Sequence, residues 1–298
     1  MQFWKSNLML LSAAIIWGFA FVYQIIGMEH LGPFSFNGLR FILGALSLVP
    51  VMLLLSRNHH LTEDNEPDNR WLVRGGVVAG VILFIASNFQ QVGLQYTTAG
   101  KAGFITGLYI LFVPVIGLFM KQLANTRTWV GAFIALIGLY FLCIKDDLVL
   151  AYGDALQLAG ALFWAAHVVF IGWVSPRVNA IRLSIIQFLV CGALCLIVAV
   201  IREQITLHAI SQAIVPLAYA GILSVGVAYT FQVIAQRDAK ASHAAIIMST
   251  EAAFAALGGW WLLNEEITSK MLVGCVLMPF GMIISQLPNK SKKPESSM

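Results

Sequence analysis

The sequence predicts an all-α integral membrane protein, with ten transmembrane helices arranged as two inverted five-helix repeats around a central cavity. The composition supports this, because 59% of the 298 residues are hydrophobic and only 11% are charged, against about 25% charged in soluble domains. Apolar runs of roughly 20 residues, the helix length that crosses a bilayer core about 30 Å thick, recur along the chain. Polar and aromatic residues of the first half also recur in the second half at a nearly fixed offset.

The composition excludes several classes of protein. A soluble enzyme of this length needs a more charged surface than 18 basic and 14 acidic residues provide. A nucleic-acid binder would gather its basic residues on one face, whereas here they are scattered between apolar runs. Cys191 and Cys195 are one helical turn apart but have no histidine or acid beside them, so we expect membrane-packing residues and no metal site. No cofactor is expected, and no phosphate-binding G-x-x-x-x-G-K-[ST] loop occurs.

Each predicted helix is a charge-poor apolar run between polar segments. The first is expected to be retained, because it lacks a clear small-residue cleavage site. The second extends back through Arg40 to Pro33, and the ninth is interrupted only by Glu251. Pro114 removes one backbone donor from the fourth helix and could kink it. The predicted spans are 7–27, 33–55, 72–93, 98–120, 128–145, 154–174, 182–201, 213–236, 241–263 and 269–287.

Lysine and arginine in the loops predict the orientation of these helices. Cytoplasmic segments of membrane proteins carry an excess of basic residues. With the N-terminus in the cytoplasm, 13 basic residues fall in inner segments and 3 in outer loops. We therefore expect a multi-pass protein of the cell membrane, in a prokaryote the inner membrane, with both termini cytoplasmic. The expected organisation is a first repeat at 1–145, an external linker at 146–153, a second repeat at 154–287 and a disordered basic cytoplasmic tail at 288–298.

The two halves of the chain are related by an internal repeat. Asn7 and Trp17 recur as Asp154 and Trp164, 147 positions later, and Arg40 corresponds to Gln187 at the same offset. Five helices in each half mean that the second half enters the membrane from the opposite side. Transporters with such inverted repeats bind substrate near the bilayer midplane, at the interface between repeats. Further along, the offset becomes 142 and relates Lys101 to His243 and Tyr109 to Glu251.

Several segments resemble the drug/metabolite transporter superfamily, and specifically its EamA-type members. They are residues 16–22 (IWGFAFV), 96–109 (YTTAGKAGFITGLY), 163–167 (FWAAH) and 249–256 (STEAAFAA), and the likeness runs from about residue 8 to 286. This resemblance implies a ten-helix secondary carrier that exports amino acids or other small metabolites. The family often has a proline where this chain has Ala252. Its absence argues against a broken helix at Glu251.

Charged and polar residues within the predicted helices are the candidate substrate-binding residues, because ionisable groups are costly in hydrocarbon and mark functional sites. Glu251 could be a proton site, could bind a substrate ammonium group, or could form a structural pair with Arg40 or Lys101. Arg40 could clamp a carboxylate or act only within the fold, and Lys101 could face a wet cavity or reach the membrane surface. The remaining candidates are His167, Gln187, Gln90, and the deep aromatic residues Trp17, Trp164, Tyr109 and Tyr229.

The sequence therefore predicts a secondary transporter that moves a small metabolite, an amino acid or a related compound, by alternating access. Its expected partners are that substrate and the lipid bilayer. A proton gradient, with protons as a further partner, or the substrate's own gradient would supply the energy, and the sequence leaves both open. Two alternatives remain at this point. A membrane-embedded enzyme would need clustered histidine, acid or cysteine residues, and the only dense cluster lies at 59–68. A non-transporting membrane subunit would not need buried charges.

Overall fold

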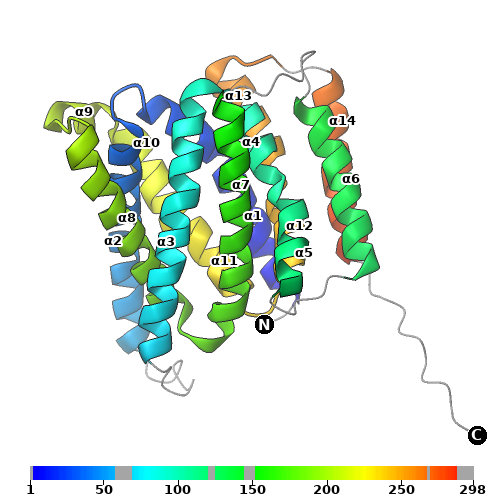
Figure 1. Cartoon of the computed structure of the whole chain (residues 1–298), viewed down its shortest axis with the longest axis horizontal. Helices are drawn as coiled ribbons and strands as arrows, with labels where there is room; N and C mark the ends of the chain where they lie inside the picture. The colour runs from blue at the N-terminus through cyan, green and yellow to red at the C-terminus, as the bar shows by residue number, and fades with distance from the viewer. Residues whose placement is uncertain (1–2, 58–68, 120–124, 144–151, 267–268, 287–298) are drawn as a thin grey trace, which may run out of the picture.

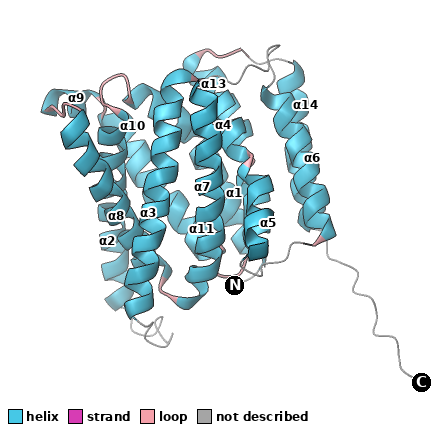
Figure 2. Ribbon diagram, viewed as in Figure 1, coloured by secondary structure: helices cyan, strands magenta, loops and turns pink. Residues whose placement is uncertain are grey.

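The computed structural model describes residues 3–57, 69–119, 125–143, 152–266 and 269–286, and all the regular structure within these ranges is helical (Figure 2). The helices run between two ends of a bundle (Figure 1). We call the end at which the chain begins, at the bottom of Figure 1, the N-terminal end. The other is called the opposite end. The polar segment around residues 59–68 and the basic tail at 288–298 lie outside the described ranges.

The helix bounds agree closely with the predicted spans at most positions. The first half consists of α1 (Phe3–Gly27), α2 (Pro33–Arg57), α3 (Asn69–Gly93), η2 (Leu94–Tyr96), α4 (Ala99–Gly107), α5 (Tyr109–Phe119) and α6 (Thr126–Cys143). The second half consists of α7 (Tyr152–Val174), η3 (Ser175–Arg177), α8 (Ala180–Arg202), α9 (Leu207–Gln212), α10 (Ile214–Ala218), the π-helix η4 (Tyr219–Tyr229), α11 (Thr230–Ala235), α12 (Ala241–Met248), α13 (Glu251–Leu263) and α14 (Ser269–Gln286). Of the expected external linker, Tyr152 and Gly153 belong to α7 instead.

The helical segments have the length and surface of a membrane protein. Within the described ranges, eight helical segments are long and apolar enough to cross a bilayer, and two shorter apolar stretches occur in α6 and α14. The outward faces of the bundle carry large apolar side chains that would be unfavourable in water. Examples are Phe133, Ile197, Val200 and Val276, which are all more than half exposed. The described chain is therefore an all-helical membrane protein.

Three of the predicted spans are not single continuous α-helices. The span at 98–120 is divided into α4 and α5 at Leu108, and the span at 241–263 into α12 and α13 at Ser249 and Thr250. The span at 213–236 consists of α10, η4 and α11. Sequence periodicity missed these breaks because every part of each span remains apolar and helical.

The two broken helices are interrupted at equivalent positions. α5 begins at Tyr109 and α13 at Glu251, and these two residues are 142 positions apart. In α13 the amides of Ala252 and Ala253 bond carbonyls three residues back, as in a 3₁₀ turn. The hydroxyls of Ser249 and Thr250 donate to the carbonyls of Ile246 and Ile247, at 2.9 and 2.7 Å. Polar side chains thus end α12 without the proline, and the expectation of an unbroken helix at Glu251 is wrong.

The packing of the helices reflects the repeat. α2 packs on α8 and α6 on α14, so two equivalent pairs contact each other directly, and the contact of α4 with α13 has its counterpart in that of α5 with α12. Contacts of α3 with α7 and α8 have counterparts in those of η4 with α1 and α2. Likewise, the contact of α1 with α13 has its counterpart in that of α7 with α5. Each of these helix–helix contacts therefore has an equivalent when the two halves are exchanged. A pseudo-twofold axis through the centre of the bundle requires this.

Glycines allow the close helix crossings, as small residues commonly do in membranes. Gly76 and Gly80 of α3 face Ile186 and Val190 of α8, and Gly103 of α4 faces Ala252 and Ala255 of α13. At the α6–α14 crossing, a Cβ added to either Gly131 or Gly281 would lie 2.6 Å from the carbonyl oxygen of the other. The helices that carry the central residues are thus held at short range.

We expect Gly18→Ala to destabilise the protein, because the added Cβ would lie 2.3 Å from Cβ of Phe254 and 2.8 Å from the backbone of α13. Such overpacking costs about 1–3 kcal/mol and should lower the melting temperature in detergent. Gly160→Ala is the matched control, because its Cβ would meet its nearest neighbour at 3.4 Å. Equal melting temperatures for the two variants would contradict the close packing of α1 on α13.

Candidate functional site

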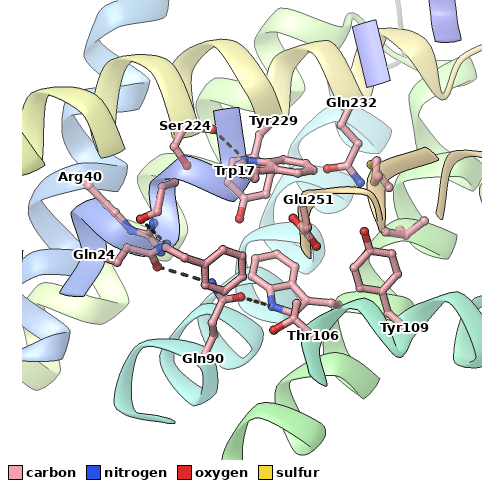
Figure 3. A pocket seen from close by; sticks show the side chains of 15 residues that line it. Trp17, Gln24, Arg40, Gln90, Thr106, Tyr109, Ser224, Tyr229, Gln232 and Glu251 are labelled. Atoms are coloured by element: carbon pink, nitrogen blue, oxygen red, sulfur yellow. Dashed lines mark hydrogen bonds between the residues drawn. The ribbon is translucent and has the colours of Figure 1, made fainter. Parts of the chain in front are cut away.

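A cavity lies at the centre of the bundle, between the two halves. The space within it that no atom fills is about 460 Å³, a volume that includes open solvent. It takes side chains from both broken helices, from the middle of α1 and α7, and from the π-helix (Figure 3). The lining residues are Trp17, Ala20, Phe21, Gln24, Arg40, Gln90, Thr106, Tyr109, Trp164, Val168, Ser224, Tyr229, Gln232, Met248 and Glu251.

The cavity lies on the pseudo-twofold axis. Many of its lining residues occur in pairs at the offsets of the repeat, which are 147 in the early helices and 142 in the later ones. The cavity is therefore formed by equivalent segments of both halves. The pairs are Trp17 with Trp164, Phe21 with Val168, Gln90 with Gln232, Thr106 with Met248, and Tyr109 with Glu251.

Three aromatic rings form one wall. The Trp17 and Tyr229 rings are 4.7 Å apart between centroids, and Trp164 stacks on Tyr229 at 5.9 Å. The Trp17 indole donates to the carbonyl oxygen of Ser224 in the π-helix, at 3.2 Å. The indole of Trp164 donates to the side-chain oxygen of Gln90, at 2.8 Å. Because both indole nitrogens are bonded, the ring faces are fixed and can contact an apolar or cationic group.

Arg40 brings a buried cation to the cavity. It is 2% exposed, and its Nε donates to Asn37 Oδ1 at 2.9 Å. The guanidinium carbon lies 5.0 Å from the centre of the Phe41 ring. Asn37 in turn donates to Asn88 Oδ1 at 3.0 Å, which fixes its amide. Within the described ranges the two terminal nitrogens of Arg40 form no hydrogen bond, so they remain available to an anionic group.

Glu251 brings a buried carboxyl group to the same cavity. It is the first residue of α13 and is 5% exposed. Tyr109 lines the cavity together with Glu251, and the two side chains lie near each other in Figure 3. Among the described residues, no basic side chain forms an ion pair with Glu251. The expected structural pairing of Glu251 with Arg40 or Lys101 is therefore wrong.

Amide side chains line the part of the cavity between these groups. Gln90 Nε2 donates to Gln24 Oε1 at 3.5 Å, and Gln24 Nε2 donates to the Ala20 carbonyl at 3.0 Å. Gln232 donates to Gln236 Oε1 at 2.9 Å. These contacts orient the amides, which can then donate to or accept from a polar ligand.

Three of the candidate residues lie away from the cavity lining. Lys101 forms an ion pair with Asp154, with Nζ 2.6 Å from Oδ2, near the opposite end of the bundle. His167 and Gln187 bond each other, with 3.0 Å between Nε2 and Oε1. His167 still contacts the wall from behind, because its ring is 6.3 Å from that of Tyr229. The other seven candidates, Trp17, Arg40, Gln90, Tyr109, Trp164, Tyr229 and Glu251, all line the cavity.

Some lining residues are missing from the sequence-based set. Gln232 is not one of these, because the sequence already marks it as a candidate cavity donor within the eighth predicted span, and it corresponds to Gln90 at the offset of 142. The same register relates Thr106 to Met248. Gln24 and Ser224 carry no such signal, because the first has an apolar counterpart and the second presents its backbone carbonyl to Trp17.

No metal site can be built from the described residues. None of them form a group of three or more histidine, cysteine, aspartate or glutamate side chains. Cys191 and Cys195 are buried, and Cys195 Sγ accepts from Asn88 Nδ2 at 3.1 Å. Both cysteines act here as packing residues beside the network that orients Arg40.

We expect Ala252→Pro to be tolerated at the break in the ninth span. The Ala252 amide makes only a 3₁₀-type bond to the Ser249 carbonyl, at 3.2 Å, and lies in the first turn of α13. Proline is accepted there but costs about 3 kcal/mol or more in a helix interior. Ala256→Pro, one turn further along, is the control. A thermal melt should separate the two variants, and equal destabilisation would show that α12 and α13 form one continuous helix.

Comparison with known proteins agrees with this geometry. The sequence profile of the EamA-like transporter family matches residues 4–144 and again residues 151–286. An uncharacterized transporter of Archaeoglobus fulgidus is 30% identical over 95% of this chain and 86% of its own length. The uncharacterized transporter YoaV of Bacillus subtilis is 22% identical over 97% and 99%. A crystal structure with 17% identity shares the fold, with a TM-score of 0.75 over 94% of this chain and 96% of the other. The chain therefore belongs to the EamA-like transporter family of the drug/metabolite transporter superfamily and is a multi-pass membrane transporter.

Proposed function

We propose that this protein is a secondary carrier for a small zwitterionic metabolite, with amino acids as the first candidates. One observation carries the proposal. The central cavity presents a buried guanidinium and a buried carboxyl group that do not pair with each other. A ligand with one carboxylate and one ammonium group would complement both.

The buried charges of Arg40 and Glu251 are costly as long as neither has a partner of opposite charge. An isolated ion in a low-dielectric interior is unfavourable unless a partner compensates it. A substrate carboxylate could accept two parallel bonds from the terminal nitrogens of Arg40, since guanidinium and carboxylate groups match in shape. A substrate ammonium could bind the Glu251 carboxylate, next to the electron-rich faces of Trp17 and Tyr229. The cavity therefore favours a zwitterion over a purely cationic or anionic compound of the same size.

The lining restricts the ligand further. Pockets for small molecules are mostly apolar, with a few placed polar groups. Phe21, Val168 and Met248 give the cavity an apolar side that suits an uncharged side chain. The proposed substrates are thus amino acids with uncharged side chains or their close relatives.

Transport is proposed to occur by alternating access, with the two halves moving around the cavity. The duplicated architecture and the broken helices at its centre are features of carriers that work in this way. We further propose cytoplasmic termini, from the distribution of basic residues, and export as the physiological direction. A gradient of protons or of the substrate itself would drive the transport.

The proposal is tested with purified protein in two steps. A thermal-shift screen of amino acids, their amides and the corresponding amines identifies ligands, because a compound that binds the folded state raises the melting temperature. Uptake of the best ligand is then measured in proteoliposomes loaded with the same compound. We expect zwitterions to give both the shift and saturable exchange. Equal shifts for zwitterions, amides and amines would contradict the assigned charge pattern.

A further inference from the structure

Two polar contacts tie the halves of the protein together at opposite ends of the bundle. Near the opposite end, Lys101 of α4 forms its ion pair with Asp154 of α7, at 2.6 Å. Near the N-terminal end, His243 of α12 bonds Asn7 of α1, with 3.1 Å between Nε2 and Oδ1. Each contact joins one residue of the first half to one of the second half.

These two contacts are equivalent under the internal repeat. Asn7 and Asp154 are separated by the offset of 147, and Lys101 and His243 by the offset of 142. The pseudo-twofold axis that relates the two faces of the cavity therefore also exchanges the two contacts. Because that axis exchanges the two ends of the bundle, an equivalent polar contact occurs once at each end.

The helices that carry these contacts also carry the cavity. Trp17 follows Asn7 by ten residues in α1, and Trp164 follows Asp154 by ten in α7, a rise of about 15 Å in each. Tyr109 and Glu251 follow Lys101 and His243 by eight residues, on the far side of the helix breaks. The short helices α4 and α12 therefore each lie between a break and an end contact.

We propose that Lys101–Asp154 and His243–Asn7 are the two gates of the carrier, and that they open alternately. This rests on the proposed alternating-access transport. α4 swings about the break at Leu108 and opens the cavity to the opposite end when Lys101 leaves Asp154. α12 swings about Ser249 and Thr250 and opens the cavity to the N-terminal end when His243 leaves Asn7. In the present structure both contacts are formed.

The experiment measures access to the cavity from each side of the membrane. The four native cysteines are replaced, and Ala20→Cys, which lies in the cavity lining, serves as the reporter. A membrane-impermeant maleimide is added from one side or the other of oriented vesicles. We expect Asp154→Asn to speed labelling from the opposite end and to slow it from the N-terminal end. The expected factor is roughly three to ten, the population change that loss of one hydrogen bond produces.

The reverse shift is expected for Asn7→Ala, with faster labelling from the N-terminal end. Glu29→Gln is the matched control for Asp154→Asn, because Glu29 is exposed at the opposite end and outside both gates. Exchanging the charges, Lys101→Asp with Asp154→Lys, should restore the original labelling. Labelling that changes equally from both sides, or not at all in any gate variant, would overturn the proposal.

A check of folding and the use of substrate-free labelling allow each outcome of the experiment to be interpreted. Folding of each variant is checked by its melting temperature, and the charge exchange provides a second test if Asp154→Asn does not fold. The labelling needs no substrate. Normal gating with no amino-acid transport would therefore refute the proposed substrate alone, and normal transport with unshifted labelling would refute the gates alone.

Discussion

Arg40→Lys is expected to weaken the binding of substrates with a free carboxylate by roughly 10- to 100-fold. Lysine retains the positive charge but loses the two parallel donors of the guanidinium group. Hydrogen bonds to charged groups contribute about 1.5–3 kcal/mol, and each 1.4 kcal/mol or so is about tenfold in affinity. The corresponding amides accept hydrogen bonds less strongly than carboxylates, so their binding should weaken much less. Thermal shift or exchange inhibition with acid and amide pairs measures the difference.

The comparison of acid with amide separates recognition from folding. A damaged cavity would weaken both members of each pair to the same extent. Arg182→Lys in α8 is the control substitution, because Arg182 is exposed near the end of the bundle. Equal losses for acids and amides in Arg40→Lys would show that Arg40 maintains the fold and does not touch the substrate.

Glu251→Gln is expected to abolish uptake driven by a pH gradient while leaving substrate exchange measurable at a higher substrate concentration, because the glutamine oxygen still accepts a hydrogen bond from the ammonium group but carries no charge. A buried carboxyl group can take up and release a proton, and desolvation favours its neutral form. Glutamine has almost the same shape as the protonated acid but cannot titrate. The variant should therefore still cycle with bound substrate, but no longer respond to the proton gradient. Uptake into proteoliposomes, with and without an imposed gradient, measures both activities.

The control for this prediction is Glu29→Gln, which makes the same chemical change on the exposed surface. It should retain driven uptake. Unchanged driven uptake in Glu251→Gln would exclude proton coupling through this residue. Loss of exchange even at saturating substrate, together with loss of driven uptake, would show that Glu251 serves substrate binding alone.

The main features of the fold could be predicted from the sequence because they depend on local composition and on the repeat. Apolar runs between basic loops define the spans, and the spacing of Trp17 and Trp164 relates the halves. The breaks at Leu108 and Thr250 could not be predicted in the same way. They depend on hydroxyl-to-backbone bonds and 3₁₀ turns inside segments that remain apolar throughout.

In the candidate site, too, some features could be predicted from the sequence and others could not. Arg40 and Glu251 stood out because charged residues are rare in apolar helices. Lys101 carries the same signal, but its partner Asp154 is 53 positions away and draws it to the end of the bundle. His167 and Gln187 form a hydrogen bond with each other behind the aromatic wall. Sequence alone therefore identifies buried polar groups, whereas tertiary contacts decide which of them face the cavity.

The central claim is that substrate passes through the cavity between the two repeats. Ala20 is 1% exposed and lines that cavity, so Ala20→Phe should fill part of it. The most direct test is amino-acid exchange in proteoliposomes by Ala20→Phe, compared with Ile15→Phe, which adds a ring on the outer surface of the same helix. We expect exchange to be lost in the first variant and retained in the second, at similar melting temperatures. Full exchange by Ala20→Phe would contradict the claim.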